Sequence, residues 1–142
     1  MDKKLFKLSF AYAVIGMLTG AVYREFSKFA DFDGKTIFSV IHTHMIILGA
    51  IMFLILFLFE RLYSVSEEKM FRAFFYVYNI ALVINFATMY ARGTIQILQV
   101  EIANGLSAAI SGMAGMSHGL LGISLILLFI AFKRTLFVKN EV

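Results

Sequence analysis

Three histidines are the residues of this chain best suited to chemistry, and all three lie in apolar surroundings. His42 and His44 stand near the start of a run from Ile37 to Phe59 that contains no Asp, Glu, Lys or Arg, and His118 lies in a second such run. An ionisable side chain at membrane depth is costly and by default indicates a functional site. Neutral imidazole can bind a metal ion or heme iron, relay protons or hydrogen-bond a neighbouring helix.

The composition around these histidines is typical of an integral membrane protein. The 142 residues are 61% hydrophobic and 15% charged, whereas a soluble domain is nearer half apolar and about a quarter charged. The absence of cysteine excludes disulfides, iron–sulfur clusters and thiolate ligands. The chain is therefore expected to be a multi-pass membrane protein, and no nucleic-acid partner is expected.

Four apolar segments must position the histidines, and each is long enough to cross a bilayer as a helix. They cover residues 5–26, 37–60, 71–97 and 107–132. The short polar connections between them favour an all-α, up-down-up-down four-helix bundle that forms one transmembrane domain over residues 1–142. The first segment also has the basic start and short apolar core of a signal peptide. Its Gly16 and Gly20, however, are spaced for close helix packing, which favours a retained span.

Lysines and arginines predict the orientation of these spans. Three lie at the N-terminus (Lys3, Lys4 and Lys7), three lie around the turn from the second to the third span (Arg61, Lys69 and Arg72), and three follow the fourth span (Lys133, Arg134 and Lys139). The opposite side has four: Arg24, Lys28, Lys35 and Arg92. Because cytoplasmic loops are enriched in basic residues, both termini are predicted to be cytoplasmic.

The histidines are predicted to share one depth in the outer half of the membrane. Counted back from Glu60 and Lys133, which end their spans, the imidazoles lie roughly 22–27 Å from the inner boundary at about 1.5 Å per residue. His42 and His44 cannot both face one ligand, because residues two apart on a helix point about 200° apart. The His44 face continues with branched aliphatic residues, as a lipid-facing surface does, so His42 is expected to point into the bundle. His44 is left to face the next helix, a second ligand or a second subunit.

Heme is the ligand that this pattern favours. Heme iron takes imidazole at its axial positions, often from two helices of a bundle. The predicted axial pair is His42 with His118, and His44 is the substitute. Four methionines are further candidates for the sixth position: Met45, Met89, Met113 and Met116.

The porphyrin predicts further contacts, because it is wide and apolar and carries two anionic propionates. Glycines provide room where helices would otherwise touch, and basic or polar side chains bind the propionates. In the third span a polar stripe recurs every seven residues and is expected to face the bundle; its members are Tyr78, Asn85, Arg92 and Gln99. The candidate cofactor-binding residues are His42, His44, His118, Gly49, Gly115, Gly122, Tyr78, Asn85 and Arg92.

Several alternatives stay open. Three imidazoles also suit a zinc or copper ion, but no carboxylate lies inside a span to complete such a site. The histidines could instead only hydrogen-bond neighbouring helices, or could serve a proton or ion carrier. Arg92 could pair with Glu101 across a short loop rather than with a propionate. Nothing resembles a nucleophile–base pair for hydrolysis, and a binding protein is expected rather than an enzyme.

Two resemblances point in the same direction. The stretch from His42 to Ala50 resembles the His-x-His helices that carry heme ligands in heme–copper oxidase catalytic subunits, although this chain has too few spans and histidines for an oxidase with a copper centre. In size, in its four spans, and in His42-Thr43-His44 and Ser117-His118-Gly119, the chain resembles a family of small bacterial membrane proteins of the heme-sensing membrane protein A type.

The second resemblance implies capture or sequestration of b-type heme in the bacterial plasma membrane, with protection against heme and oxidative stress. The alternatives are a small cytochrome b that exchanges electrons with quinone, and a structural or regulatory subunit without cofactor. The expected partners are heme and the lipid bilayer, and a homo-oligomer and quinone are further candidates.

Overall fold

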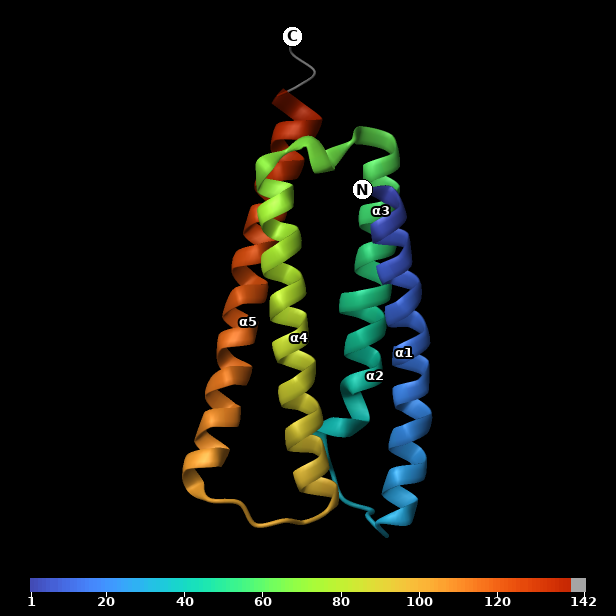
Figure 1. The fold of residues 1–142 in the computed structure, drawn as a ribbon, viewed down its shortest axis with the longest axis vertical. Helices are drawn as coiled ribbons and strands as arrows, with labels where there is room; N and C mark the ends of the chain where they lie inside the picture. Colours follow the sequence, from blue (N-terminus) through green and yellow to red (C-terminus); the bar gives the residue numbers. More distant parts are fainter. Residues whose placement is uncertain (139–142) are drawn as a thin grey trace.

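The polypeptide folds into four long antiparallel helical spans joined by short connections (Figure 1). The structure is a computed structural model that describes residues 1–138. Its elements are α1 (Asp2–Phe29), η1 (Ile37–Val40), α2 (Ile41–His44), η2 (Met45–Ile51), α3 (Met52–Tyr63), η3 (Val65–Glu67), α4 (Lys69–Ile97), α5 (Asn104–Lys133) and η4 (Arg134–Val138). No strand occurs within residues 1–138, which confirms the predicted all-α class.

Each of the four spans is long and apolar enough to cross a membrane. The second span is built from η1, α2, η2 and α3 in succession, and the four spans cover the four apolar ranges predicted from the sequence. Successive spans run in opposite directions, so Met1 and the end of η4 lie at the same end of the molecule (Figure 1). Lys139, one of the basic residues that predict the orientation, lies outside the described residues.

Hydrogen bonds to the Gln96 side chain of α4 hold the start of the second span. The hydroxyl of Thr36 accepts a hydrogen bond from the Phe38 N–H at 3.1 Å and donates to the Gln96 side chain, also at 3.1 Å. Gln96 Oε1 accepts a second hydrogen bond, from the Ile37 N–H at 2.8 Å. These contacts satisfy amide groups at the start of a helix that have no partner within it. They fix where the second span begins relative to the end of α4.

A π-helical segment, Met45–Ile51, follows His44 directly. Such wide turns are rare and interrupt an otherwise α-helical span. Hydroxyls from the two flanking helices bind its carbonyl groups: Tyr78 of α4 donates to the Leu48 carbonyl at 2.7 Å, and Ser9 of α1 donates to the Ala50 carbonyl at 2.8 Å. The wide turn is therefore held from both sides, directly after His44.

Aromatic side chains fill the interior between α1, the second span and α4. Phe53 stacks on Tyr12 of α1 with ring centroids 5.8 Å apart, and it meets Tyr78 of α4 edge-on at 5.8 Å. Phe38 packs edge-on against Tyr90 at 5.2 Å. Paired rings of this kind stabilise a core beyond the area they bury. These three spans thus form one packed unit.

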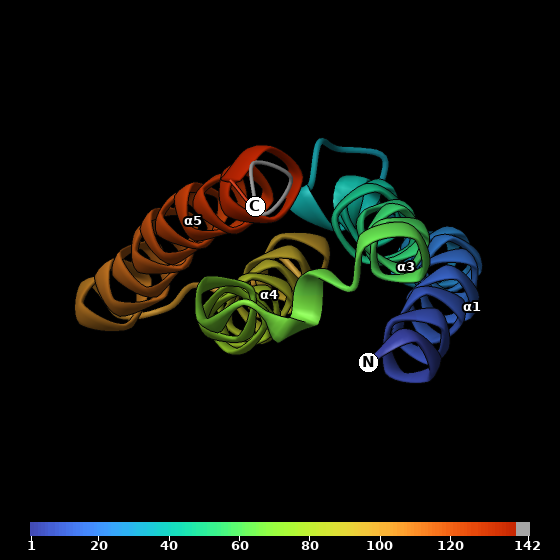
Figure 2. The same ribbon diagram turned by 90° about the horizontal axis from the view of Figure 1, so that it is seen from above.

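The fourth span is placed differently. Over the described residues α5 packs chiefly on α4 (Figure 2). Near the end that holds Met1 it also meets the second span, where Phe59 and Phe132 stack with centroids 4.6 Å apart. The beginning of α5 diverges from the second span, with α4 lying between them (Figures 1 and 2). This divergence leaves a hollow between the second span and α5.

Candidate functional site

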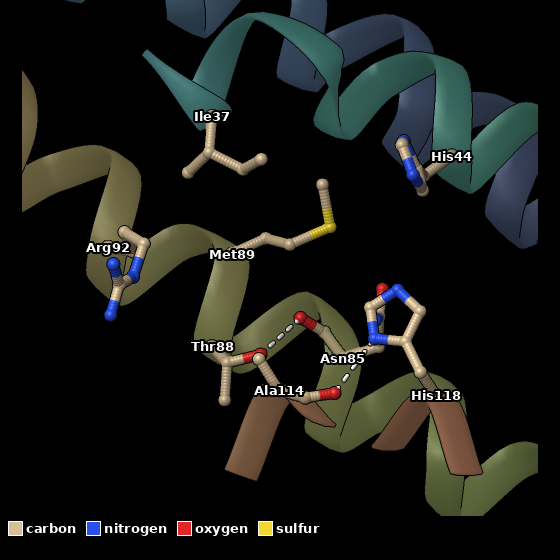
Figure 3. Close-up of a pocket in the computed structure, with 8 residues that line it drawn as sticks. All are labelled: Ile37, His44, Asn85, Thr88, Met89, Arg92, Ala114 and His118. Carbon is tan, nitrogen blue, oxygen red and sulfur yellow. Dashed lines mark hydrogen bonds between the residues drawn. The ribbon is translucent and has the colours of Figure 1, made fainter. Parts of the chain in front are cut away.

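A hollow lies between the second span and α5, with α4 as its floor (Figure 3). It has a volume of about 140 Å³ and adjoins a second hollow of about 340 Å³ on the same side of the molecule. The two share only His44 and His118 among their lining residues. The first is lined by Ile37, His44, Asn85, Thr88, Met89, Arg92, Ala114 and His118, and the second by Thr43, His44, Ile47, Leu48, His118 and Leu121. Two of the three histidines are therefore brought to one place.

His44 and His118 are oriented in the same way. The Nδ1–H of His44 donates to the Val40 carbonyl at 2.9 Å, and the Nδ1–H of His118 donates to the Ala114 carbonyl at 2.8 Å, in each case four residues earlier. Because a carbonyl oxygen can only accept, Nδ1 carries the proton and a neutral ring keeps its lone pair on Nε2. Within residues 1–138 no hydrogen bond engages either Nε2. In Figure 3 the two rings face each other across the hollow.

His42 does not join them. It points into the bundle, as expected, but toward α1 rather than toward this hollow, so the structure does not bring it together with His118, its predicted axial partner. Its ring lies against α1, where a Cβ added at Gly20 would be 3.6 Å from His42 Cγ. Its Nε2 contacts the Thr43 hydroxyl at 3.2 Å, and its buried Nδ1 has no hydrogen-bond partner. The physical reason is that the buried face of the second span packs on α1, whereas the hollow lies on the partly exposed face that carries His44.

The three predicted glycines also lie away from this hollow. Gly49 faces α1, because an added Cβ would lie 2.6 Å from the Cβ of Tyr12. Gly115 and Gly122 are exposed, line neither hollow, and have no atom within 4 Å of an added Cβ. Of the small residues near His118, Ala114 is the one that lines the hollow. None of the three predicted glycines therefore makes room for a ligand there.

The polar stripe of α4 faces the interior for three of its four residues. Tyr78 holds the π-helical segment through its hydroxyl, Asn85 and Arg92 line the hollow, and Gln99 is exposed beyond the end of α4. The Asn85 amide donates to the Ser117 hydroxyl at 3.2 Å, and its buried Oδ1 has no partner. Asn85 is 1% exposed, so an unsatisfied acceptor there is costly and favours a donor from water or ligand.

Arg92 reaches across to α5. Its guanidinium donates to the Ser111 hydroxyl at 2.6 Å and to the Ser107 carbonyl at 3.2 Å. Among the ion pairs formed within residues 1–138, none joins Arg92 to Glu101. The cation at the edge of the hollow is thus held by neutral oxygens, which leaves its charge available to an anion. Neither serine was among the predicted site residues, although polar residues recur along the α5 face that meets α4.

Of the four methionines proposed as iron ligands, one lines the hollow and the others lie elsewhere. Met89 lines the hollow, and Figure 3 shows its sulfur pointing between the two histidine rings and Ile37. Met45 is buried toward α1, where the Thr19 hydroxyl contacts its sulfur at 3.6 Å. Met113 and Met116 are exposed and line neither hollow. Only Met89 is therefore placed to contact a ligand beside the histidines.

The donor set limits which ligands suit the site. Among the described residues no group of three or more His, Cys, Asp or Glu side chains is clustered as a bare metal ion requires. Two imidazoles alone do not make the four-coordinate shell that zinc prefers. Two imidazoles do match the axial positions of an iron whose other four ligands come from a macrocycle.

Comparison with known proteins gives a family. No curated protein and no solved structure matches the chain. A family model described as "Protein of unknown function (DUF2871)" matches residues 2–135, which cover both histidine-bearing spans and the whole of α4. This match extends over nearly the full sequence, and the chain therefore belongs to the DUF2871 family.

Proposed function

We propose that this membrane protein binds b-type heme between His44 and His118. The observation that carries the proposal is the matched state of these two imidazoles on different helices. In both, Nδ1 is bonded to the carbonyl four residues earlier and Nε2 is free beside one hollow. A hydrogen bond from the far ring nitrogen is the usual support of a metal-binding histidine, since it fixes the tautomer and the ring orientation.

The surroundings fit a macrocycle better than a bare ion. The two hollows, of about 140 and 340 Å³, adjoin at the histidines and have mainly apolar walls. The smaller hollow alone is below the roughly 300–1,000 Å³ of small-molecule and cofactor sites, but the two taken together fall within that range. His44 and His118 would hold the iron, Met89 would pack against the ring, and Arg92 would bind a propionate. Bound heme would supply a redox-active iron.

Capture or sequestration of heme in a bacterial plasma membrane is the proposed physiological role. It rests on the sequence resemblance to heme-sensing membrane proteins and on a site that lies open between two helices. Protection against heme and oxidative stress would follow, because heme held by two axial ligands is withdrawn from free reactions in the membrane. An electron carrier would differ in one measurable respect, since its heme would be rapidly reduced by a quinol.

The visible spectrum of the protein purified in detergent tests the proposal. After expression with heme supplied, the wild type should show a Soret band and the bands of six-coordinate iron. His44→Ala and His118→Ala should each lose heme or give five-coordinate iron. His42→Ala is the matched control: it removes the same side chain two residues away and should keep the wild-type spectrum.

Two outcomes would overturn the assignment. A folded wild-type protein without a Soret band would reject heme and favour a subunit without cofactor. A spectrum that is lost in His42→Ala but kept in His44→Ala would restore the axial pair predicted from the sequence. Rapid reduction by a quinol would replace sequestration by electron transfer while leaving the heme site in place.

A further inference from the structure

A third hollow, with a different chemistry, lies at the other end of the molecule, between α1 and α3. Its volume is about 390 Å³, and it is lined by Asp2, Lys3, Phe6, Lys7, Phe57 and Arg61. Figure 1 shows the start of α1 beside α3 at the end that is predicted to be cytoplasmic. None of these residues belongs to the histidine site, so this hollow requires an explanation of its own.

Positive charge predominates around this hollow. Three cations, Lys3, Lys7 and Arg61, face a single carboxylate, that of Asp2. Arg61 already pairs with Asp2 at 3.5 Å, on the rim. The two lysines are exposed, and among the ion pairs formed within residues 1–138 neither takes part. The hollow therefore carries unneutralised positive charge from two lysines on successive turns of α1.

The inner wall of the hollow is aromatic. Phe6 and Phe57 pack with ring centroids 5.6 Å apart, and Phe6 is 51% exposed. One helical turn deeper, the same two helix faces continue with Phe10 and Leu54, which are both exposed apolar side chains. The hollow thus passes from a cationic rim to an apolar surface that runs down into the membrane.

The start of α1 is held against the second span, so the two walls keep their separation. The α-amino group of Met1 lies 3.6 Å from Glu60 Oε1. Glu60 in turn accepts hydrogen bonds from the N–H and the hydroxyl of Ser66, at 2.8 and 2.6 Å. The rim is thereby organised before any ligand binds, which lowers the entropic cost of binding.

We infer that this hollow binds the headgroup of an anionic phospholipid, with its phosphate at Lys3 and Lys7 and its acyl chains along Phe10 and Leu54. Basic pockets at the cytoplasmic ends of membrane helices suit such headgroups. A soluble phosphate would use the rim but would gain nothing from the apolar wall. The inference is independent of the proposed heme site.

The absence of tryptophan from the chain allows a local test. Phe57→Trp places a single fluorophore in the hollow, and Phe6→Trp does so from the other helix. The full-length protein in detergent micelles would be titrated with phosphatidylglycerol carrying brominated acyl chains, which quench tryptophan on contact. Brominated phosphatidylcholine is the zwitterionic comparison. Stronger quenching by phosphatidylglycerol is expected in both variants.

Substitution of the lysines separates this site from general attraction to the membrane. Added to either tryptophan variant, Lys3→Gln and Lys7→Gln should each lower the preference for phosphatidylglycerol about fivefold, the scale of one basic residue near an anionic surface. Lys4→Gln is the matched control, because Lys4 carries the same charge on the same turn but does not line the hollow. Equal quenching by the two lipids, or an equal loss in Lys4→Gln, would overturn the inference. Displacement of the lipid by millimolar inorganic phosphate would assign the hollow to a soluble anion and overturn it as well.

Discussion

At the residue scale, the difference between His42 and His44 lies in what holds each ring. His44 and His118 each bond to a carbonyl of their own helix and leave Nε2 free. His42 is packed against α1 and its Nδ1 is buried without a partner. His42 and His44 are only two residues apart, yet their rings differ in whether a nitrogen is free beside the hollow. The proposed ligand can therefore reach a free ring nitrogen on His44 and on His118 but not on His42.

Arg92 supplies the first residue-scale prediction. If its guanidinium binds a propionate, Arg92→Ala should weaken heme binding by roughly 1–3 kcal/mol, the scale of a lost charge-assisted hydrogen bond. The spectrum of the bound heme should not change, because the axial histidines are untouched. Titration of the purified variant with heme measures both quantities.

Glu101→Ala serves as the control for that experiment. Arg92 bonds to Ser107 and Ser111 rather than to Glu101, so Glu101→Ala should leave heme affinity unchanged. Unchanged affinity in Arg92→Ala, together with a response in Glu101→Ala, would remove Arg92 from the site and assign it to a loop ion pair.

At the element scale, the contact between α1 and the second span depends on Gly49. A Cβ at this position would overlap the ring of Tyr12 on the facing helix. Gly49→Ala should therefore destabilise the protein by about 1–3 kcal/mol, as overpacking of a close helix contact does. Gly122→Ala, in open space on α5, should be neutral or slightly stabilising, since alanine favours a helix. Denaturation in detergent measures both, and equal stability of the two variants would contradict the observed packing.

The π-helical segment provides a second test at this scale. Tyr78→Phe removes the hydroxyl that binds the Leu48 carbonyl and should lower the free energy of unfolding by about 0.5–1.5 kcal/mol. It should also alter the heme spectrum, because Leu48 lies one turn after His44 on the second hollow. Tyr76→Phe, at an exposed position on the same helix, should change neither quantity. A wild-type spectrum in Tyr78→Phe would separate the wide turn from the orientation of His44.

The sequence predicts these elements better than it predicts their faces. Long uncharged runs must become spanning helices, because backbone groups in a bilayer need internal partners. The face of the second span that carries His42, expected to point into the bundle, continues with Met45, Gly49 and Phe53, which are buried. The sequence pattern shows that this face is buried but does not show which helix covers it. In the structure, α1 covers it. The π-helical segment and the divergence of α5 arise from tertiary contacts, so the periodicity of residues 37–60 could not pair His44 with His118.

At the scale of the whole molecule, the four antiparallel spans place both ends of the described chain on one side. The distribution of lysine and arginine predicts that this side is cytoplasmic. A reporter that is active only outside the cell should be silent when fused after Val142 and active when inserted between α4 and α5. The reverse pattern would invert the orientation and place the lipid hollow on the outer leaflet.

The divergence of α5 from the second span has a consequence for kinetics. The hollow that holds the two histidines opens sideways between helices, where exposed Ile47 and Thr43 would meet acyl chains rather than water. A hydrophobic ligand would then arrive by two-dimensional diffusion after partitioning into the lipid. Its loading rate would follow its mole fraction in the membrane. Dilution of the vesicles with empty lipid should therefore slow loading in proportion, even when the total concentrations of ligand and protein stay constant.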